Sequence, residues 1–134
     1  MNNVAQDLSE LLNSAGCPAS GFMGSMQEGE QAAILAFPNK PFCLVRNWRI
    51  IEVEVADNYK DALARDGLSP FVLYASYVVL HSAGKRQPGD WVRTTFLRSL
   101  TKGFLFESVN TIYVLLGAGV RLKGSSNAVL SIGQ

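Results

Sequence analysis

Hydrophobic positions recur every three or four residues in the first part of the chain, which is the spacing of helices with one buried face. Residues 3–14 show this pattern at Val4, Leu8, Leu11 and Leu12. A loop is expected over residues 17–24. Ser25 and Glu28 then match the Ser-x-x-Glu pattern of a helix capping box. The sequence therefore predicts two N-terminal helices, the second of which begins at Ser25 and ends before Pro38.

Farther along the chain the pattern changes to the alternation that is typical of strands. Residues 42–46 form a short apolar run, and residues 50–55 alternate apolar with acidic side chains, as in a strand with one solvated face. Asn47 and Trp48 lie between these runs and predict a tight turn, which would make the two strands a hairpin. Both faces of residues 71–80 are largely apolar, which predicts a central strand covered on two sides.

The rest of the chain adds one helix and several short strands. Residues 57–66 have the pattern of a mostly solvated helix, and we expect Gly67 to end it. Gly117-Ala118-Gly119 is typical of a tight turn and predicts a hairpin. The short strands that we expect, separated by glycines and other turn residues, cover residues 91–96, 104–107, 111–116, 120–123 and 128–132.

This order of elements predicts an α+β fold, in which N-terminal helices pack on a mostly antiparallel sheet or a small β-barrel. A length of 134 residues suits one domain over residues 1–134. Its helical part covers about residues 1–37 and its strand-rich part about residues 42–132. Apolar residues make up 48% of the chain and charged residues 17%, which is enough apolar surface for a substantial core.

The composition favours a cytoplasmic protein. Cys17 and Cys43 are the only cysteines and lack a metal-ligand spacing, whereas small secreted domains usually carry more cysteines. The first residues lack the basic start and apolar run of a signal peptide. The longest apolar stretch, residues 71–80, is about half the length of a membrane-spanning helix. We therefore expect no membrane partner.

Templates for catalysis and cofactor binding match poorly. His81 is the only histidine, and Ser82 beside it would point to the opposite side of a strand, so the two do not form a nucleophile and its base. Cys43 lies in an apolar run, where a structural thiol is expected. Glu52 and Glu54 are expected on a solvated face. The glycine-rich segments join strands and do not open a helix, so they are turns and not phosphate loops. We predict no catalytic residue, no metal and no cofactor.

The charges are unevenly distributed, although the net charge is only +1. Residues 1–70 carry nine acidic and five basic side chains, a net −4, whereas residues 71–134 carry two acidic and seven basic ones, a net +5. The basic half also contains aromatic residues, and an indole beside guanidinium groups can stack on a base or anchor a protein interface. The alternative is that Trp91 belongs to the core and the cations are merely solvated. The candidate binding residues are Lys85, Arg86, Trp91, Arg93, Arg98, Arg121 and Lys123.

Three stretches resemble a family of small uncharacterised proteins with a domain of unknown function: FPNKPFCLVR at residues 37–46, PGDWVRTT at residues 88–95 and NTIYVLLG at residues 110–117. The resemblance covers roughly residues 30–132. Members are similar to open reading frames carried by prophages and other mobile elements of gram-negative bacteria. The resemblance implies an accessory protein of a mobile element, and such proteins often bind host or phage machinery stoichiometrically. It assigns no activity to any residue here.

Taken together, these features favour a small non-enzymatic interaction protein of a phage or mobile element. We expect it to bind a host or phage macromolecule, with a protein as the first choice of partner and inhibition of a defence or regulatory system as one such role. The alternative is a nucleic-acid-binding small β-domain that uses the basic C-terminal half. A small enzyme is the third hypothesis. Whether the chain forms homo-oligomers stays open.

Overall fold

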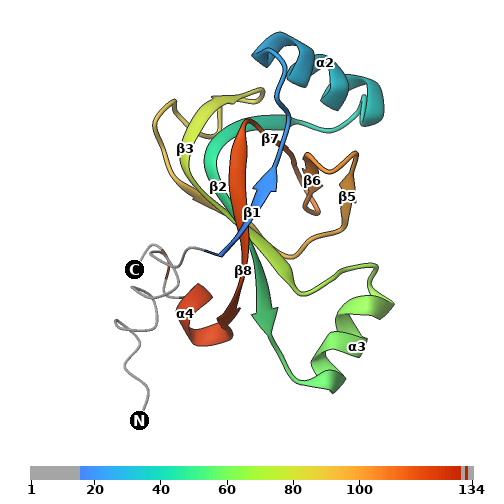
Figure 1. Ribbon diagram of the computed structural model, residues 1–134. Coiled ribbons are helices and arrows are strands. Elements are labelled where there is room, and N and C mark those ends of the chain that lie inside the picture. Colours follow the sequence, from blue (N-terminus) through green and yellow to red (C-terminus); the bar gives the residue numbers. More distant parts are fainter. Residues whose placement is uncertain (1–15, 131, 133–134) are drawn as a thin grey trace.

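The computed structural model describes residues 16–130 and residue 132 (Figure 1). An eight-stranded mixed sheet curls into a half-barrel and carries three helices in this part of the chain, which confirms the α+β class. The predicted helix over residues 3–14 lies outside the described residues. The elements are β1 (Cys17–Ser20), α2 (Met26–Ala36), β2 (Phe42–Glu54), α3 (Asp57–Arg65), β3 (Phe71–His81), β4 (Val92–Arg93), β5 (Ser99–Thr101), β6 (Leu105–Glu107), β7 (Ile112–Leu115), β8 (Ala118–Ser125) and α4 (Ser126–Leu130).

Local sequence signals determine the ends of α2 and α3 as predicted. The backbone N–H of Glu28 donates to Ser25 Oγ at 3.2 Å, and the N–H of Ser25 donates to Glu28 Oε1 at 3.1 Å, which completes the capping box. Helix α2 ends shortly before Pro38, and α3 ends shortly before Gly67, which has a φ of +74°. Both predicted helices are confirmed.

The predicted hairpin over residues 42–55 is wrong, because these residues form one continuous strand, β2. Asn47 does adopt a left-handed conformation, with a φ of +53°, but the strand and its pairing with β3 continue on both sides of it. Trp48 is 98% buried, and its indole Nε1 donates to the carbonyl oxygen of Leu116 at 3.2 Å. A turn would have exposed this indole. Burial of its large apolar surface instead holds the strand extended across the sheet.

Strand β2 is the axis of the sheet (Figure 1). Along one edge it pairs antiparallel with β3. Along the other edge it pairs with β7 and then with β8, both parallel to it. The predicted hairpin around Gly117-Ala118-Gly119 is therefore wrong, since β7 and β8 follow one another in the same direction beside β2. Gly119 is small because the Trp48 indole packs directly on it, where a Cβ atom would overlap the ring.

The remaining strands extend the sheet on both sides and correct three further predictions. Residues 17–20, expected in a loop, form β1, which pairs antiparallel with β8. Only Val92 and Arg93 of the expected strand 91–96 pair, as β4, with β3. The expected strand 128–132 is replaced by the helical turn α4, with Ile132 packed against the same cluster. The sheet is thus mixed and open, and not an antiparallel meander or a closed barrel.

Strands β5 and β6 form a tight hairpin that folds over the inner face and continues onto β7. Lys102 and Gly103 both have positive φ values, of 57° and 78°, as a type I′ turn requires. This hairpin brings Phe106 against the inner face of β2 and β3, where it is fully buried.

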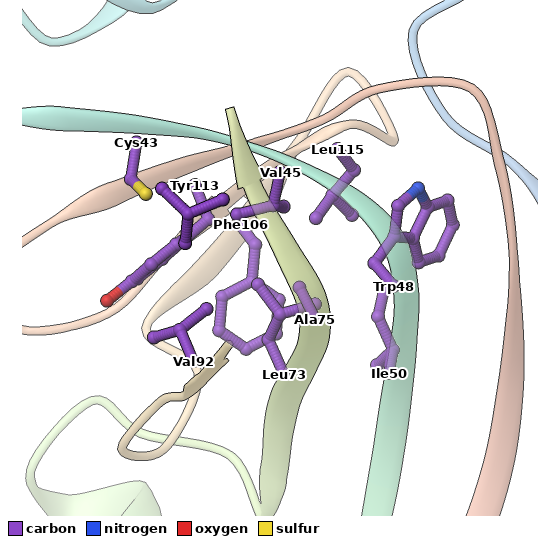
Figure 2. Close-up of a cluster of buried hydrophobic side chains, with 11 residues drawn as sticks. Cys43, Val45, Trp48, Ile50, Leu73, Ala75, Val92, Phe106, Tyr113 and Leu115 are labelled. Atoms are coloured by element: carbon purple, nitrogen blue, oxygen red, sulfur yellow. The ribbon is translucent and has the colours of Figure 1, made fainter. Parts of the chain in front are cut away.

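The core is divided between the two faces of the curled sheet. The inner face holds the largest cluster, in which Trp48 lies at one end and Cys43 and Tyr113 at the other (Figure 2). The outer face holds two smaller clusters. One includes Leu44 and lies under α2, and the other includes Ile51 and lies under α4. The two helices therefore cover opposite ends of the outer face.

The contact between Trp48 and Gly119 can be tested by adding one methyl group. We expect Gly119→Ala to lower the free energy of unfolding by about 1–3 kcal/mol, because the methyl group would overpack a buried ring. Urea denaturation measures this loss. Gly84→Ala is the matched control: its φ is +71° but the space around it is open, so its cost is backbone strain alone, about 1–2 kcal/mol. Adding Trp48→Phe to Gly119→Ala should make the two effects non-additive, since the smaller ring leaves room. Strictly additive effects would contradict the contact.

Candidate functional site

The middle of the outer sheet face carries a cluster of aromatic and arginine side chains. Strand pairing defines it, because residues directly opposite each other on paired strands point to the same face. Arg49 of β2 lies opposite Tyr74 of β3, which lies opposite Arg93 of β4. We call the cluster the aromatic–arginine face; its members are Arg46, Arg49, Tyr74, Tyr77, Trp91 and Arg93.

Three further residues complete this surface. Arg46 lies opposite Tyr77 in the same pair of strands, farther toward α2. Trp91 alternates with the inward-pointing Val92, and its ring centroid is 6.4 Å from that of Tyr74. Tyr77 and Trp91 are each 45% exposed, and Arg46 is exposed as well. The face thus presents aromatic rings and guanidinium groups to solvent together.

The arginines of this face are not neutralised by carboxylates. Within residues 16–130 and 132, no carboxylate oxygen lies within 4.0 Å of a guanidinium nitrogen of Arg46 or Arg49. The Nε atom of Arg49 is buried and has no hydrogen-bond partner among these residues. Arg93 donates from one terminal nitrogen to the carbonyl oxygen of Val129 in α4, at 3.1 Å. The face therefore holds positive charge that is available to a ligand.

Lys40 provides the contrast, because its charge is used inside the fold. Its Nζ atom lies 2.7 Å from Glu107 Oε2 and also donates to the carbonyl oxygen of Ser108 at 2.7 Å. Burial opposes ionisation of Glu107, but the hydrogen bonds from Lys40 and Ser99 lower the pKa of its carboxyl group overall. This ion pair ties the start of β2 to the β6–β7 turn, which is a structural role.

The sequence-predicted binding residues fall into several places. Trp91 and Arg93 lie together on the aromatic–arginine face. Arg121 and Lys123 lie on the opposite face of the sheet, since they pair with Ile50 and Glu52 on the inner side of β2. The two groups therefore cannot contact one flat ligand simultaneously.

The other three predicted cations lie away from the aromatic–arginine face. Lys85 and Arg86 are exposed in the segment between β3 and β4, where their charges act on His81. Arg98 is exposed beside β5, and its charge acts on Glu107. The structure thus brings two of the seven predicted residues together on this face.

Four residues of the face were missed by sequence reasoning: Arg46, Arg49, Tyr74 and Tyr77. The two arginines flank Asn47-Trp48, so the predicted turn placed them at hairpin ends. The two tyrosines lie in a run so apolar that both its faces were assigned to the core. Because they are three residues apart, strict alternation places them on opposite faces, and the run alone offered no signal that joins them.

The structure also places the lone histidine beside the buried cysteine. Cys43 pairs with His81 of β3 on one side and with Tyr113 of β7 on the other, so the three side chains form one row on the inner face. A Cys–His pair on neighbouring strands is a geometry that nucleophilic catalysis uses. Its protonation and burial decide whether it can react.

The protonation states of Cys43 and His81 do not suit nucleophilic catalysis. Burial raises the pKa of the Cys43 thiol to about 12, although the Arg86 charge opposes this, and the side chain is fully buried. Burial, followed by the charges of Lys85 and Arg86, lowers the pKa of His81, so its neutral form dominates near pH 7. The N–H of Ala83 donates to His81 Nδ1 at 3.1 Å, which places the imidazole proton on Nε2. His81 then has no free acceptor atom with which to take the thiol proton.

Among residues 16–130 and 132, no group of three or more histidine, cysteine, aspartate or glutamate side chains is arranged to hold a metal ion. In the same part of the chain, no helix has the length and apolar character needed to cross a membrane.

The two cysteines should differ sharply in reactivity. Cys17 is exposed at β1, whereas Cys43 is buried and its thiol has the raised pKa. We expect a thiol-specific maleimide at neutral pH to label one cysteine per native chain, and Cys17→Ser to abolish this labelling. Cys43 should react only after the chain is unfolded in denaturant. Rapid native labelling of the Cys17→Ser variant, measured by mass spectrometry, would contradict the inert setting of Cys43 and reopen a catalytic interpretation.

Comparison with known proteins gives a family but no activity. Searches of the curated proteins and of the solved structures find no match to the chain. One family model matches residues 20–131, which covers every described strand of the sheet except most of β1. The chain therefore belongs to the domain of unknown function family DUF6957.

Proposed function

We propose that this domain is a non-enzymatic interaction module that binds a protein partner through its aromatic–arginine face. The observation that carries the proposal is the uncovered middle of the outer sheet face. Helix α2 covers the outer cluster at one end and α4 covers the other, while Tyr77 and Trp91 between them stay 45% exposed. Aromatic side chains held on a rigid sheet lose little entropy when a partner covers them.

The composition of the face supports a protein interface. Trp, Tyr and Arg are the residue types that dominate binding energy in protein–protein contacts. Leu80, which is 41% exposed and lies opposite Leu44 in the same pair of strands, extends the apolar surface toward α2. A partner that covers these groups gains both apolar burial and hydrogen bonds to guanidinium groups.

The charge of the face defines the chemistry of that partner. The strand rows that contain Arg46, Arg49 and Arg93 include no acidic residue of β2, β3 or β4. Burial of unpaired guanidinium groups would be costly, so the contact surface of the partner must supply carboxylates opposite them. We therefore propose a partner with an acidic contact surface that also contains apolar side chains.

Nucleic acid is the second candidate, and the unpaired guanidinium groups of Arg46 and Arg49 favour it. Single strands bind on open sheet faces where aromatic rings stack with bases and arginines contact phosphates. Three phosphate contacts to a single strand would give a salt dependence of log affinity of about −2 per log unit of salt. This candidate uses the aromatic–arginine face and not the whole basic C-terminal half, because Arg121 and Lys123 point to the inner side.

The cellular setting belongs to the same proposal. The resemblance to proteins of prophages and mobile elements supports an accessory role in which the domain binds host or phage machinery in the cytoplasm. The inert Cys43–His81 pair supports a role without chemistry, since a thiol whose pKa is about 12 is not a nucleophile near neutral pH.

Affinity capture with matched variants tests this proposal. We expect the wild-type domain to retain a stoichiometric protein from a lysate of its host, and Trp91→Ala and Arg46→Glu each to weaken retention about thirtyfold or more, as loss of about 2 kcal/mol at a hot spot would. Tyr59→Ala and Arg121→Glu are the controls. Tyr59 is 49% exposed and Arg121 is exposed, and neither lies on the aromatic–arginine face, so both variants should retain the partner.

Nuclease treatment and salt distinguish the two candidates. A protein that remains bound after nuclease treatment supports the first. Retention that nuclease removes and that weakens steeply with salt supports nucleic acid. Equal retention by wild-type, Trp91→Ala and Arg46→Glu domains, or loss with Arg121→Glu alone, would show that the aromatic–arginine face is not the contact surface.

A further inference from the structure

A cavity of about 530 Å³ lies beside the aromatic–arginine face, between α3, α4 and the ends of β2, β3 and β4. Its volume lies in the range of small-molecule sites, about 300–1,000 Å³. Two residues join α3 to the end of β2, and α4 follows directly on β8, so both walls are fixed to the sheet. Figure 1 shows α3 and α4 at this same end of the molecule.

The walls of this cavity are mostly apolar. Val53 and Val72 form its floor on the outer sheet face, and Val129 of α4 packs in the same cluster. Tyr59 and Phe96 close one side, with ring centroids 6.2 Å apart in an edge-on arrangement. Apolar surface of this kind does not bind an inorganic ion, and it favours a ligand with a hydrocarbon or aromatic body.

One cation stands at the wall of the cavity. Arg93 shares the outer face with Tyr74, and its hydrogen bond to the carbonyl oxygen of Val129, at 3.1 Å, holds the guanidinium group against α4. Only part of its donor capacity is used by this bond, because a guanidinium group has five N–H donors. Glu54 also lines the cavity, but it alternates with Val53 along β2, so its carboxylate points toward the inner side of the sheet.

We propose that this cavity binds a small amphipathic monocarboxylate, with its apolar body against Val53, Val72 and Phe96 and its carboxylate paired with Arg93. Charge complementarity selects the anionic head, since Arg93 is, among the described residues that line the cavity, the one charged side chain that strand alternation directs to this side. The hydrogen bond to Val129 fixes the guanidinium orientation before the ligand arrives, which lowers the entropy cost of pairing. This site shares Arg93 with the aromatic–arginine face, but its apolar walls lie outside that face, so the proposal does not depend on the macromolecular contact.

Isothermal titration of the full chain with paired ligands tests this site. Hexanoate, octanoate and decanoate are compared with the alcohols of the same chain lengths. We expect affinity to rise about fourfold for each added methylene until the cavity is filled. We expect each carboxylate to bind about tenfold or more tightly than its alcohol, as a hydrogen bond to a charged group would provide.

Three variants assign the binding to this cavity. Arg93→Gln should remove the preference for carboxylates while leaving alcohol binding unchanged, and Arg93→Lys should keep most of the preference. Ala56→Trp, at an exposed position of the cavity wall, should abolish binding of both series. Arg65→Gln is the matched control, because Arg65 lies in the last turn of α3 and does not line the cavity.

Each other outcome overturns the proposal. Absence of binding at millimolar ligand would remove the site, and equal binding of carboxylates and alcohols by the wild type would remove the anionic ligand class. A preference that survives Arg93→Gln, or binding that survives Ala56→Trp, would place the ligand elsewhere on the molecule.

Discussion

The packing of Trp48 on Gly119 is the contact on which the rest of this fold depends. Because Gly119 has no side chain, the bulky indole of Trp48 packs directly on the backbone of β8. A Cβ atom at Gly119 would overlap the ring. The same indole donates its N–H to the carbonyl oxygen of Leu116, at the junction of β7 and β8. Through these two contacts Trp48 joins three strands and keeps β2 extended past the left-handed Asn47. A long central strand with neighbours on both edges follows directly.

The length of that strand explains why part of its outer face is uncovered. Thirteen residues of β2 follow a curved path of about 43 Å at roughly 3.3 Å per residue (Figure 1). Helix α2, with 11 residues, spans only about 16 Å, and α4, with 5 residues, about 8 Å. The two helices therefore cover the ends, where Leu44 and Ile51 lie in apolar clusters, and leave the middle to Arg46 and Arg49. An exposed aromatic–arginine face is the consequence of this geometry, and it is the surface that we propose for binding.

Signals within a few residues of each other predicted the local structure well. The capping box of α2, the glycine after α3 and the aromatic, β-branched run of β3 each specify their element through contacts close in sequence. Sequence patterns that are compatible with either a turn or a strand led to wrong predictions. Asn47-Trp48 and Gly117-Ala118-Gly119 resemble turns, but one supplies the indole and the other the space that the indole needs, a pairing between distant segments that neither segment reveals alone.

For the candidate site too, residues close in sequence were predicted together, and residues brought together by strand pairing were not. Trp91 and Arg93 were predicted because aromatic and basic residues alternate locally in that segment. Arg46 and Arg49 could not be placed beside them, because their position on the outer face depends on β2 being one strand. Arg121 and Lys123 were included by charge alone, and the parallel pairing of β8 with β2 directs them to the inner side. The composition of the chain indicated a positively charged surface. Strand pairing determines which of the basic side chains lie on the same face of the sheet.

Proton NMR spectroscopy of the folded chain tests the packing of Trp48 on Gly119 most directly. A proton above the face of an indole ring is shifted strongly upfield, so both α-protons of Gly119 should resonate well below their random-coil positions and show nuclear Overhauser contacts to the Trp48 ring. Cross-strand contacts between Ile50 and Arg121 should accompany them, as parallel pairing of β2 with β8 requires. Random-coil shifts for Gly119, together with contacts between residues 42–46 and 50–55 as in a hairpin, would contradict the continuous central strand.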